Sequence, residues 1–124
     1  MGAFINGTGV ISPQNTHNKE VFEDGFAMLE GNRFNCIEPD YSQFIDVKQI
    51  RRMSRIIKMG VVAAQLASRD AAIENPDAII VGTAFGCLED TNSFLSKLVQ
   101  YKEDMLSPTA FIHSTHNTIA AQVA

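Results

Sequence analysis

The sequence predicts an α/β fold, in which helices pack on the faces of a mixed sheet. Two short apolar runs, Ala3–Ser12 and Ala78–Val81, have the composition of strands. Two longer segments, Met53–Ile73 and Leu88–Asp104, place apolar side chains at helical spacing. Alternation of such runs with amphipathic helices is typical of a sheet covered by helices. We therefore expect the two runs in one sheet and the two helices on its faces.

The first predicted strand, Ala3–Ser12, contains Gly7 and Gly9, which indicate a bulge or a close backbone approach. A helix is predicted over Asn18–Leu29, where apolar residues recur every three or four positions, and Gly31 ends it. Gly7 and Gly9 match the first two glycines of a dinucleotide fingerprint, but its third position is Ser12 and Pro13 follows, so no helix opens there.

The middle of the chain is irregular over Phe34–Phe44 and then strongly helical over Met53–Ile73. Small side chains line that helix and allow close packing against a neighbouring element. They are Gly60, Ala63, Ala64, Ala67 and Ala71.

The second half alternates again. A turn at Asn75–Asp77 precedes the apolar run Ala78–Val81, which has the character of a buried parallel strand. After the helix Leu88–Asp104, we expect an extended segment at Ala110–Ile112 and a further helix at Thr118–Ala124.

Composition limits the function classes. The chain has 124 residues, 45% hydrophobic and 19% charged, so residues 1–124 form one globular domain or part of one. The formal net charge of -4 and the lack of aromatic residues among the cations argue against nucleic-acid binding. No apolar stretch approaches the ~20 residues of a membrane span, and no signal peptide is recognisable. We expect a cytoplasmic protein without membrane contact.

Positive charge is concentrated in one short segment. The run from Lys48 to Lys58 holds five of the ten Lys and Arg residues, and no acid lies between Asp46 and Asp70. On an acidic chain such a patch favours an anionic partner. If the run is helical, Arg51, Arg55 and Lys58 share one face; a solvated face without a partner is the alternative.

Cysteine and histidine give weaker signals. Cys36 and Cys87 are too few and too far apart for a disulfide framework or a zinc site, and both have the character of free, buried thiols. Cys87 precedes a predicted helix, whose N-terminus can lower a thiol pKa, so modest reactivity is a minor hypothesis. His113 and His116 lie three residues apart, but no third ligand is near in sequence, so we predict hydrogen bonding and no metal.

Four motifs in order carry a resemblance. The segment A-F-I-N-G-T-G-V-I-S-P comes first, then M-S-R before a small-residue helix, then A-I-I-V-G-T-A-F-G, then L-S-P-T-A-F-I-H-S-T-H-N-T-I-A-A-Q-V-A. In this order and spacing the chain resembles the N-terminal part of the β-ketoacyl-acyl carrier protein synthases, which have the thiolase fold. The resemblance implies the N-terminal half of a layered α/β architecture.

The resemblance also implies a reaction. The family condenses an acyl thioester with malonyl-carrier protein in fatty acid or polyketide-type synthesis, using a cysteine nucleophile and two histidines. Those three residues belong to later parts of the family's sequence, so no residue of this chain is predicted to be catalytic. Cys87 falls where the family has a small residue, and His113 and His116 are not the catalytic pair.

What the resemblance carries over is binding. Lys48 and Arg51 match basic positions that meet the acidic carrier protein in some members. The predicted docking residues are Lys48, Arg51, Arg52, Arg55 and Lys58. Phe85 matches a position that gates the acyl pocket, and Ala110–Asn117 resembles the loop that lines it, so the predicted pocket residues are Phe85, Phe111, His113 and His116. The histidines stand where many relatives have apolar residues or proline, which favours a more polar substrate.

Two hypotheses follow. In the first, the chain is part of a condensing enzyme, inert alone and truncated before the catalytic region. In the second, it is a non-catalytic partner subunit resembling chain-length factors, or a carrier-binding module. Both predict a dimer of thiolase-fold subunits, and neither needs a cofactor of its own, because phosphopantetheine arrives on the carrier protein. A cysteine on a later strand-to-helix turn favours the enzyme, and Gln or Ala there favours the partner.

Overall fold

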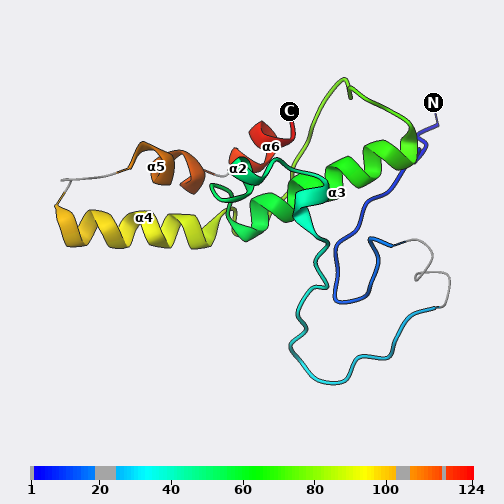
Figure 1. Ribbon diagram of the computed structural model, residues 1–124, viewed down its shortest axis with the longest axis horizontal. Helices are drawn as coiled ribbons and strands as arrows, with labels where there is room; N and C mark the ends of the chain where they lie inside the picture. Colours follow the sequence, from blue (N-terminus) through cyan, green and yellow to red (C-terminus); the bar gives the residue numbers. More distant parts are fainter. Residues whose placement is uncertain (1, 19–24, 103–106, 116) are drawn as a thin grey trace.

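The computed structural model describes residues 2–18, 25–102, 107–115 and 117–124, and within them every regular element is helical. Figure 1 shows an elongated arrangement with the longest helix, α3, at its centre and α4 extending beyond one end. The elements in order are the 3-10 helix η1 (Tyr41–Gln43), α2 (Val47–Ile50), α3 (Arg55–Ala71), α4 (Leu88–Tyr101), α5 (Pro108–Ser114) and α6 (Thr118–Val123).

Helix α3 forms the centre of the core, as its apolar pattern predicts. Ile57 and Val62 are fully buried, and Val61 is buried beside them. Helix α6 packs on α3 next to Gly60, where an added Cβ would lie 2.8 Å from Cγ2 of Ile119. The buried core consists of Ile45, Ile57, Val61, Val62, Cys87 and Ile119. The helices predicted at Met53–Ile73 and Thr118–Ala124 are thus confirmed.

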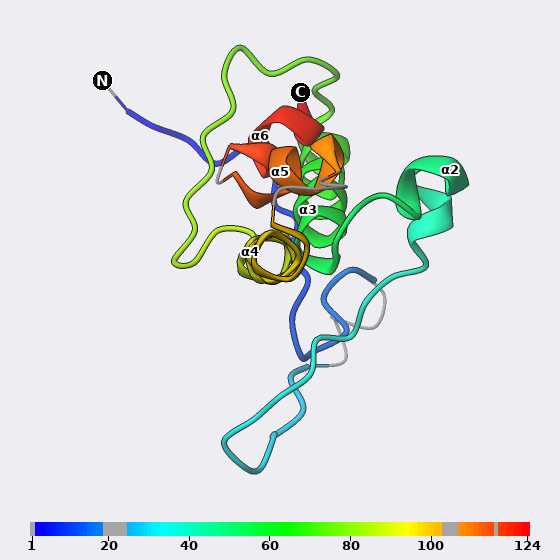
Figure 2. The same cartoon turned by 90° about the vertical axis from the view of Figure 1, so that its left-hand side faces the viewer.

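Helices α4 and α5 pack against each other beyond the end of α3, as Figure 1 shows. Figure 2 looks nearly along the axis of α4 and shows α5 beside it. The rings of Phe94 and Phe111 meet edge to face with centroids 5.6 Å apart. Thr91 Oγ1 lies 3.1 Å from the carbonyl oxygen of Ser114. The helix predicted at Leu88–Asp104 is confirmed over Leu88–Tyr101, and its last two predicted residues lie outside the described residues.

The extended segment predicted at Ala110–Ile112 is wrong, because these residues belong to α5. Pro108 occupies the first turn of that helix, where a missing N–H costs nothing, and Phe111 gains its contact with Phe94. Of the helix predicted at Asn18–Leu29, residues 19–24 lie outside the described residues, and the described end, 25–29, is not helical.

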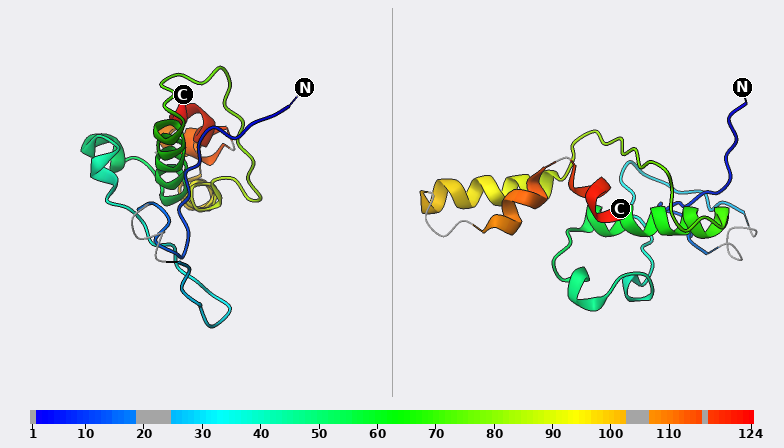
Figure 3. Two further views of the ribbon diagram at one scale, coloured as in Figure 1. Left: turned by 90° about the vertical axis from the view of Figure 1, so that its right-hand side faces the viewer. Right: turned by 90° about the horizontal axis from the view of Figure 1, so that it is seen from above.

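The predicted sheet is not found among the described residues, and this part of the α/β prediction is wrong for the structure. Neither Ala3–Ser12 nor Ala78–Val81 forms a strand. A strand depends on a ladder to a neighbour, and neither run has one here. Ile80 is 95% exposed, and the first run lies along α3 instead (Figure 3, right).

Two glycines explain how the first run approaches α3 so closely. A Cβ added at Gly7 would lie 2.5 Å from the Ala67 carbonyl oxygen, and one added at Gly9 would lie 2.7 Å from the Ala67 amide nitrogen. Thr8 between them donates its amide N–H to Asp70 Oδ2 at 2.9 Å. The close backbone approach predicted for the glycines is confirmed, with a helix as the neighbour.

Candidate functional site

The basic run folds as two helical pieces with a turn between them. Lys48 lies in α2, Arg51 and Arg52 lie in the turn, and Arg55 and Lys58 lie in the first turns of α3. Asp46 caps α2 by accepting the Lys48 amide N–H at 2.8 Å. The prediction of one shared helical face is therefore wrong for Arg51, because the helix is interrupted before Arg55.

Three of the five cations are open to an external partner. Lys48, Arg51 and Arg52 are all exposed. The structure gives none of them an ion pair or side-chain hydrogen bond with another described residue. This group, Lys48, Arg51 and Arg52, is called the α2 cations below.

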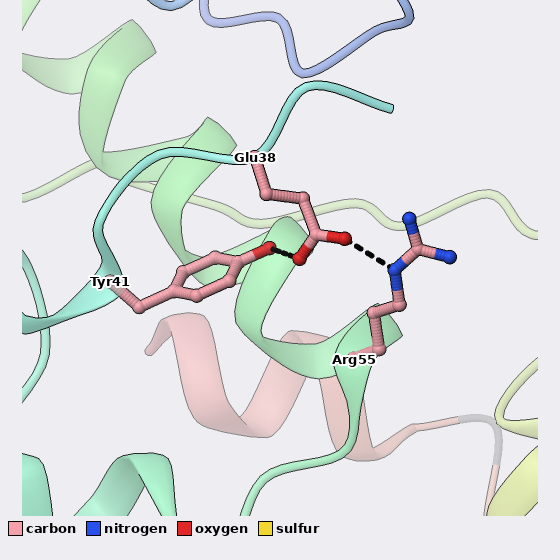
Figure 4. Close-up of polar contacts among 3 residues, drawn as sticks. All are labelled: Glu38, Tyr41 and Arg55. Carbon is pink, nitrogen blue, oxygen red and sulfur yellow. Dashed lines mark hydrogen bonds and ion pairs between the residues drawn. The ribbon is translucent and has the colours of Figure 1, made fainter. Parts of the chain in front are cut away.

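Arg55 is engaged within the chain. Its Nε donates to Glu38 Oε1 at 2.5 Å, and the hydroxyl of Tyr41 donates to Glu38 Oε2 at 2.5 Å. Figure 4 shows the carboxylate held between the two donors, with both Nη atoms of Arg55 directed away from it. The Arg55 side chain is 52% exposed and that of Glu38 is 26% exposed, so the contact lies at the surface with its acid partly sheltered.

The charges in this cluster reinforce each other. The hydrogen bond from Tyr41, with the bond and the positive charge of Arg55, lowers the pKa of Glu38 below its usual value of 4.5. Burial and the bond to the Glu38 carboxylate raise the pKa of Tyr41, so the phenol stays protonated. The bond to Glu38 raises the pKa of Arg55. Glu38 is therefore an ionised acceptor fixed from both sides.

Lys58 adds to the same cluster through an aromatic ring. Its Nζ lies 5.2 Å from the centroid of the Tyr41 ring, within the range of a cation–π contact. Sequence reasoning missed Glu38 and Tyr41, because Glu38 is 17 residues before Arg55 and no local pattern joins them. The basic run itself contains no acid, but the fold brings Glu38 into contact with Arg55.

The second candidate region is a hollow at the turn before α4. It has a volume of about 530 Å³ and is lined by residues Val81 to Cys87 together with Ser114. Phe85 lies in this lining and is 79% exposed. The turn is closed by the Gly86 amide N–H, which donates to Thr83 Oγ1 at 3.0 Å.

The other predicted pocket residues divide. Phe111 and His113 lie in α5 but are not among the residues that line the hollow, to which α5 contributes Ser114. Phe111 is 58% exposed and packs on Phe94. His116 lies outside the described residues. The structure thus brings Phe85 to a hollow and leaves the assignment of the other three as a prediction.

Cys87 is buried at the start of α4, as part of the core. Burial, and secondarily the charge of Asp90, raises the pKa of its thiol. The hypothesis of a helix-activated thiolate predicts the opposite direction and is not supported. Within the described ranges no group of three or more His, Cys, Asp or Glu residues is placed to hold a metal ion.

Comparison with known families gives a definite result. Residues 33–124 match the family described as β-ketoacyl synthase, N-terminal domain. The match covers most of the chain, so the chain belongs to this family, and the resemblance seen in the sequence is confirmed. No curated protein sequence matched the chain. No helix in the described part of the chain is long and apolar enough to cross a membrane.

Proposed function

We propose that the chain is the N-terminal portion of a β-ketoacyl-acyl carrier protein synthase and that its part in the reaction is binding. The observation that carries the proposal is the family match over residues 33–124, which includes the whole basic run and the turn with Phe85. In this proposal the basic run docks the acidic carrier protein. The turn with Phe85 receives the acyl chain, and the chemistry of condensation is supplied by residues outside this set.

The exposure of the α2 cations supports the docking role. Lys48, Arg51 and Arg52 are exposed and unpaired among the described residues, so their charges are open to a partner. Cations spread over a helix and the following turn also suit a protein surface bearing several carboxylates better than a single small anion.

A carrier-binding test separates this function from a simple solvated face. Binding of acyl carrier protein to the double variant Lys48→Glu, Arg51→Glu should fall by up to about thirtyfold at low salt, and the difference should shrink as salt rises. The control is Lys97→Glu, Lys102→Glu, which makes the same change in net charge on exposed residues of α4 and its end. Equal losses in both double variants, or no loss in either, would refute docking at the basic run.

The pocket role is tested separately. Phe85→Ala should leave carrier binding unchanged, because Phe85 lies in the hollow and not on the basic run. In a protein that carries out the condensation, it should alter which acyl chains are accepted.

A non-catalytic subunit is the second candidate. Cys87 is the thiol in the lining of the hollow, but its side chain is buried and burial raises its pKa, which does not favour a thiolate nucleophile. We predict that the 124-residue chain, incubated with acyl- and malonyl-carrier protein, makes no β-ketoacyl product. Product formation that is lost in Cys87→Ser would overturn the assignment of Cys87 as structural.

We also propose that the layered α/β fold of the thiolase type forms in an assembly of two thiolase-fold subunits, either a homodimer or a heterodimer. The support is the family and the exposure of apolar side chains in the two predicted strands: Phe4 is 86%, Ile5 87% and Ile80 95% exposed. Apolar segments that are exposed to water are typical of surfaces that bind another protein. Sedimentation of the protein should show a dimer, and a monomer at all concentrations would refute this.

A further inference from the structure

The cluster of Glu38, Tyr41 and Arg55 has a feature that the docking role alone does not explain. Glu38 contacts Arg55 only at Nε. A guanidinium has five N–H groups, so four remain on the two Nη atoms, and the structure gives these no partner among the described residues. With Nε occupied by Glu38, the two Nη atoms form a free edge that can donate to both oxygens of a carboxylate.

The support for Arg55 is fixed on both sides. Tyr41 donates to one carboxylate oxygen of Glu38, and Arg55 Nε donates to the other (Figure 4). Tyr41 is itself half-buried and carries Lys58 over its ring. A long arginine side chain normally loses rotamer entropy when it binds, and holding it in advance reduces that cost.

We propose that Glu38 and Tyr41 are positioning residues that hold Arg55 so that its two Nη atoms form a bidentate contact with a carboxylate of the acidic carrier protein. The inference rests on the proposed docking function and assigns its geometry. The α2 cations attract the partner at long range, and Arg55 supplies the oriented contact once the partner has arrived.

The carboxylate is favoured over a phosphate of the phosphopantetheine arm by the distribution of charge. Lys48, Arg51 and Arg52 extend away from Arg55 over the turn and α2, so the cations match an extended acidic surface. A single phosphate would be served by a compact group.

The decisive variant is Glu38→Gln, because two accounts predict opposite signs. Removing an acid from the surroundings of a basic patch should strengthen binding of an acidic partner if only the net field matters. If Glu38 positions Arg55, the same change should weaken binding. We expect dissociation of the carrier to become roughly three- to tenfold faster, the scale of a weakened charge-assisted hydrogen bond, with little change in association.

Tyr41→Phe tests the same geometry without any change of charge, and it keeps the ring beneath Lys58. It should also speed dissociation. Arg55→Lys keeps the charge but loses the fork, so it should behave like Glu38→Gln. The matched control is Asp40→Asn, which removes one nearby negative charge, retains a side chain able to cap η1, and does not touch Arg55. It should leave dissociation unchanged.

Three readouts keep the outcomes apart. A variant that merely unfolds lowers the fraction of chain that binds but not the dissociation rate of the chain that does. NMR without any carrier should show that the Nε–H proton of Arg55 exchanges slowly with water in the wild type and quickly in Glu38→Gln. The variants should speed dissociation of the carrier protein by the same factor whether or not it bears its phosphopantetheine arm.

Tighter binding in Glu38→Gln, or an unaltered exchange rate of the Arg55 Nε–H proton, would overturn the positioning role. A response confined to the carrier bearing its arm would overturn the carboxylate assignment. If the wild type binds no carrier, the proposed function fails, while the exchange rate still decides whether Glu38 holds Arg55.

Discussion

Helices α3 and α4 have comparable amphipathic patterns but very different surroundings. α3 has three buried residues and is covered by the first segment, with Gly7 and Gly9, by Phe44 and by helix α6. α4 has none, and Val99 on it is 81% exposed. α4 packs on α5, and the rings of Phe94 on α4 and Phe111 on α5 are in contact. Local pattern thus determines that a helix forms, and the neighbours determine how much of it contributes to the core.

The largest effect on the free energy of unfolding is expected at a core residue of α3. Ile57 is 0% exposed, and Ile57→Ala should lower the free energy of unfolding by about 2–5 kcal/mol, because it removes buried apolar area and leaves a cavity. Val99→Ala on α4 is the control and should change it by less than about 0.5 kcal/mol. Urea unfolding of both variants measures the difference. Equal losses would mean that α4 is as deeply packed as α3.

The next effect concerns the covering of α3 by the first segment. In Gly9→Ala the new Cβ meets the backbone of Ala63 and Ala67, which cannot move aside like a side chain. We expect a loss of about 1–3 kcal/mol from overpacking. Gly82→Ala, which adds a methyl group into open space, should be close to neutral. If both changes are neutral, the first segment does not pack on α3 in solution.

These two cases show what the sequence was able to predict. Helical periodicity is local, so the segments now seen as α3, α4 and α6 were predictable from spacing alone. The strands were not, because an apolar run such as Ala78–Val81 becomes a strand only when another strand pairs with it. The extended segment predicted at Ala110–Ile112 is wrong because proline, which cannot continue a helix, also fits the first turn of a new one, here α5.

The candidate site was predictable to a similar degree. The cluster of positive charge was visible in the sequence, and so was the turn containing Phe85. Glu38 was not, since its contact with Arg55 spans 17 residues and depends on the path of the loop between them. Charge patterns in a sequence identify which surface is basic, and the fold determines which of its cations are already paired.

A smaller effect on stability is expected where α4 packs on α5. The edge-to-face contact of Phe94 and Phe111 joins α4 to α5. A double-mutant cycle with Phe94→Leu and Phe111→Leu should give a coupling of about 0.5–1.5 kcal/mol, since leucine keeps apolar volume but loses the ring geometry. A cycle of Phe94 with Phe85, which is not paired with it, serves as the control and should show no coupling. Additive effects of Phe94 and Phe111 would mean that the contact between these two rings does not stabilise the packing of α4 on α5.

The smallest effect concerns the entrance to α3, where Glu38 meets Arg55. Because the pKa of Glu38 is lowered in the folded chain, its stabilising contribution is present above the unfolded value of 4.5 and is lost as pH falls through the lower folded value. The gap in unfolding free energy between wild type and Glu38→Gln should therefore be constant near about pH 7 and close toward about pH 3. In an Arg55→Gln background, where one donor and its charge are missing, the gap near about pH 7 should be smaller than in the wild-type background. A gap that widens on acidification would reverse the assigned shift, and a gap insensitive to pH would mean that Glu38 stabilises α3 through packing alone.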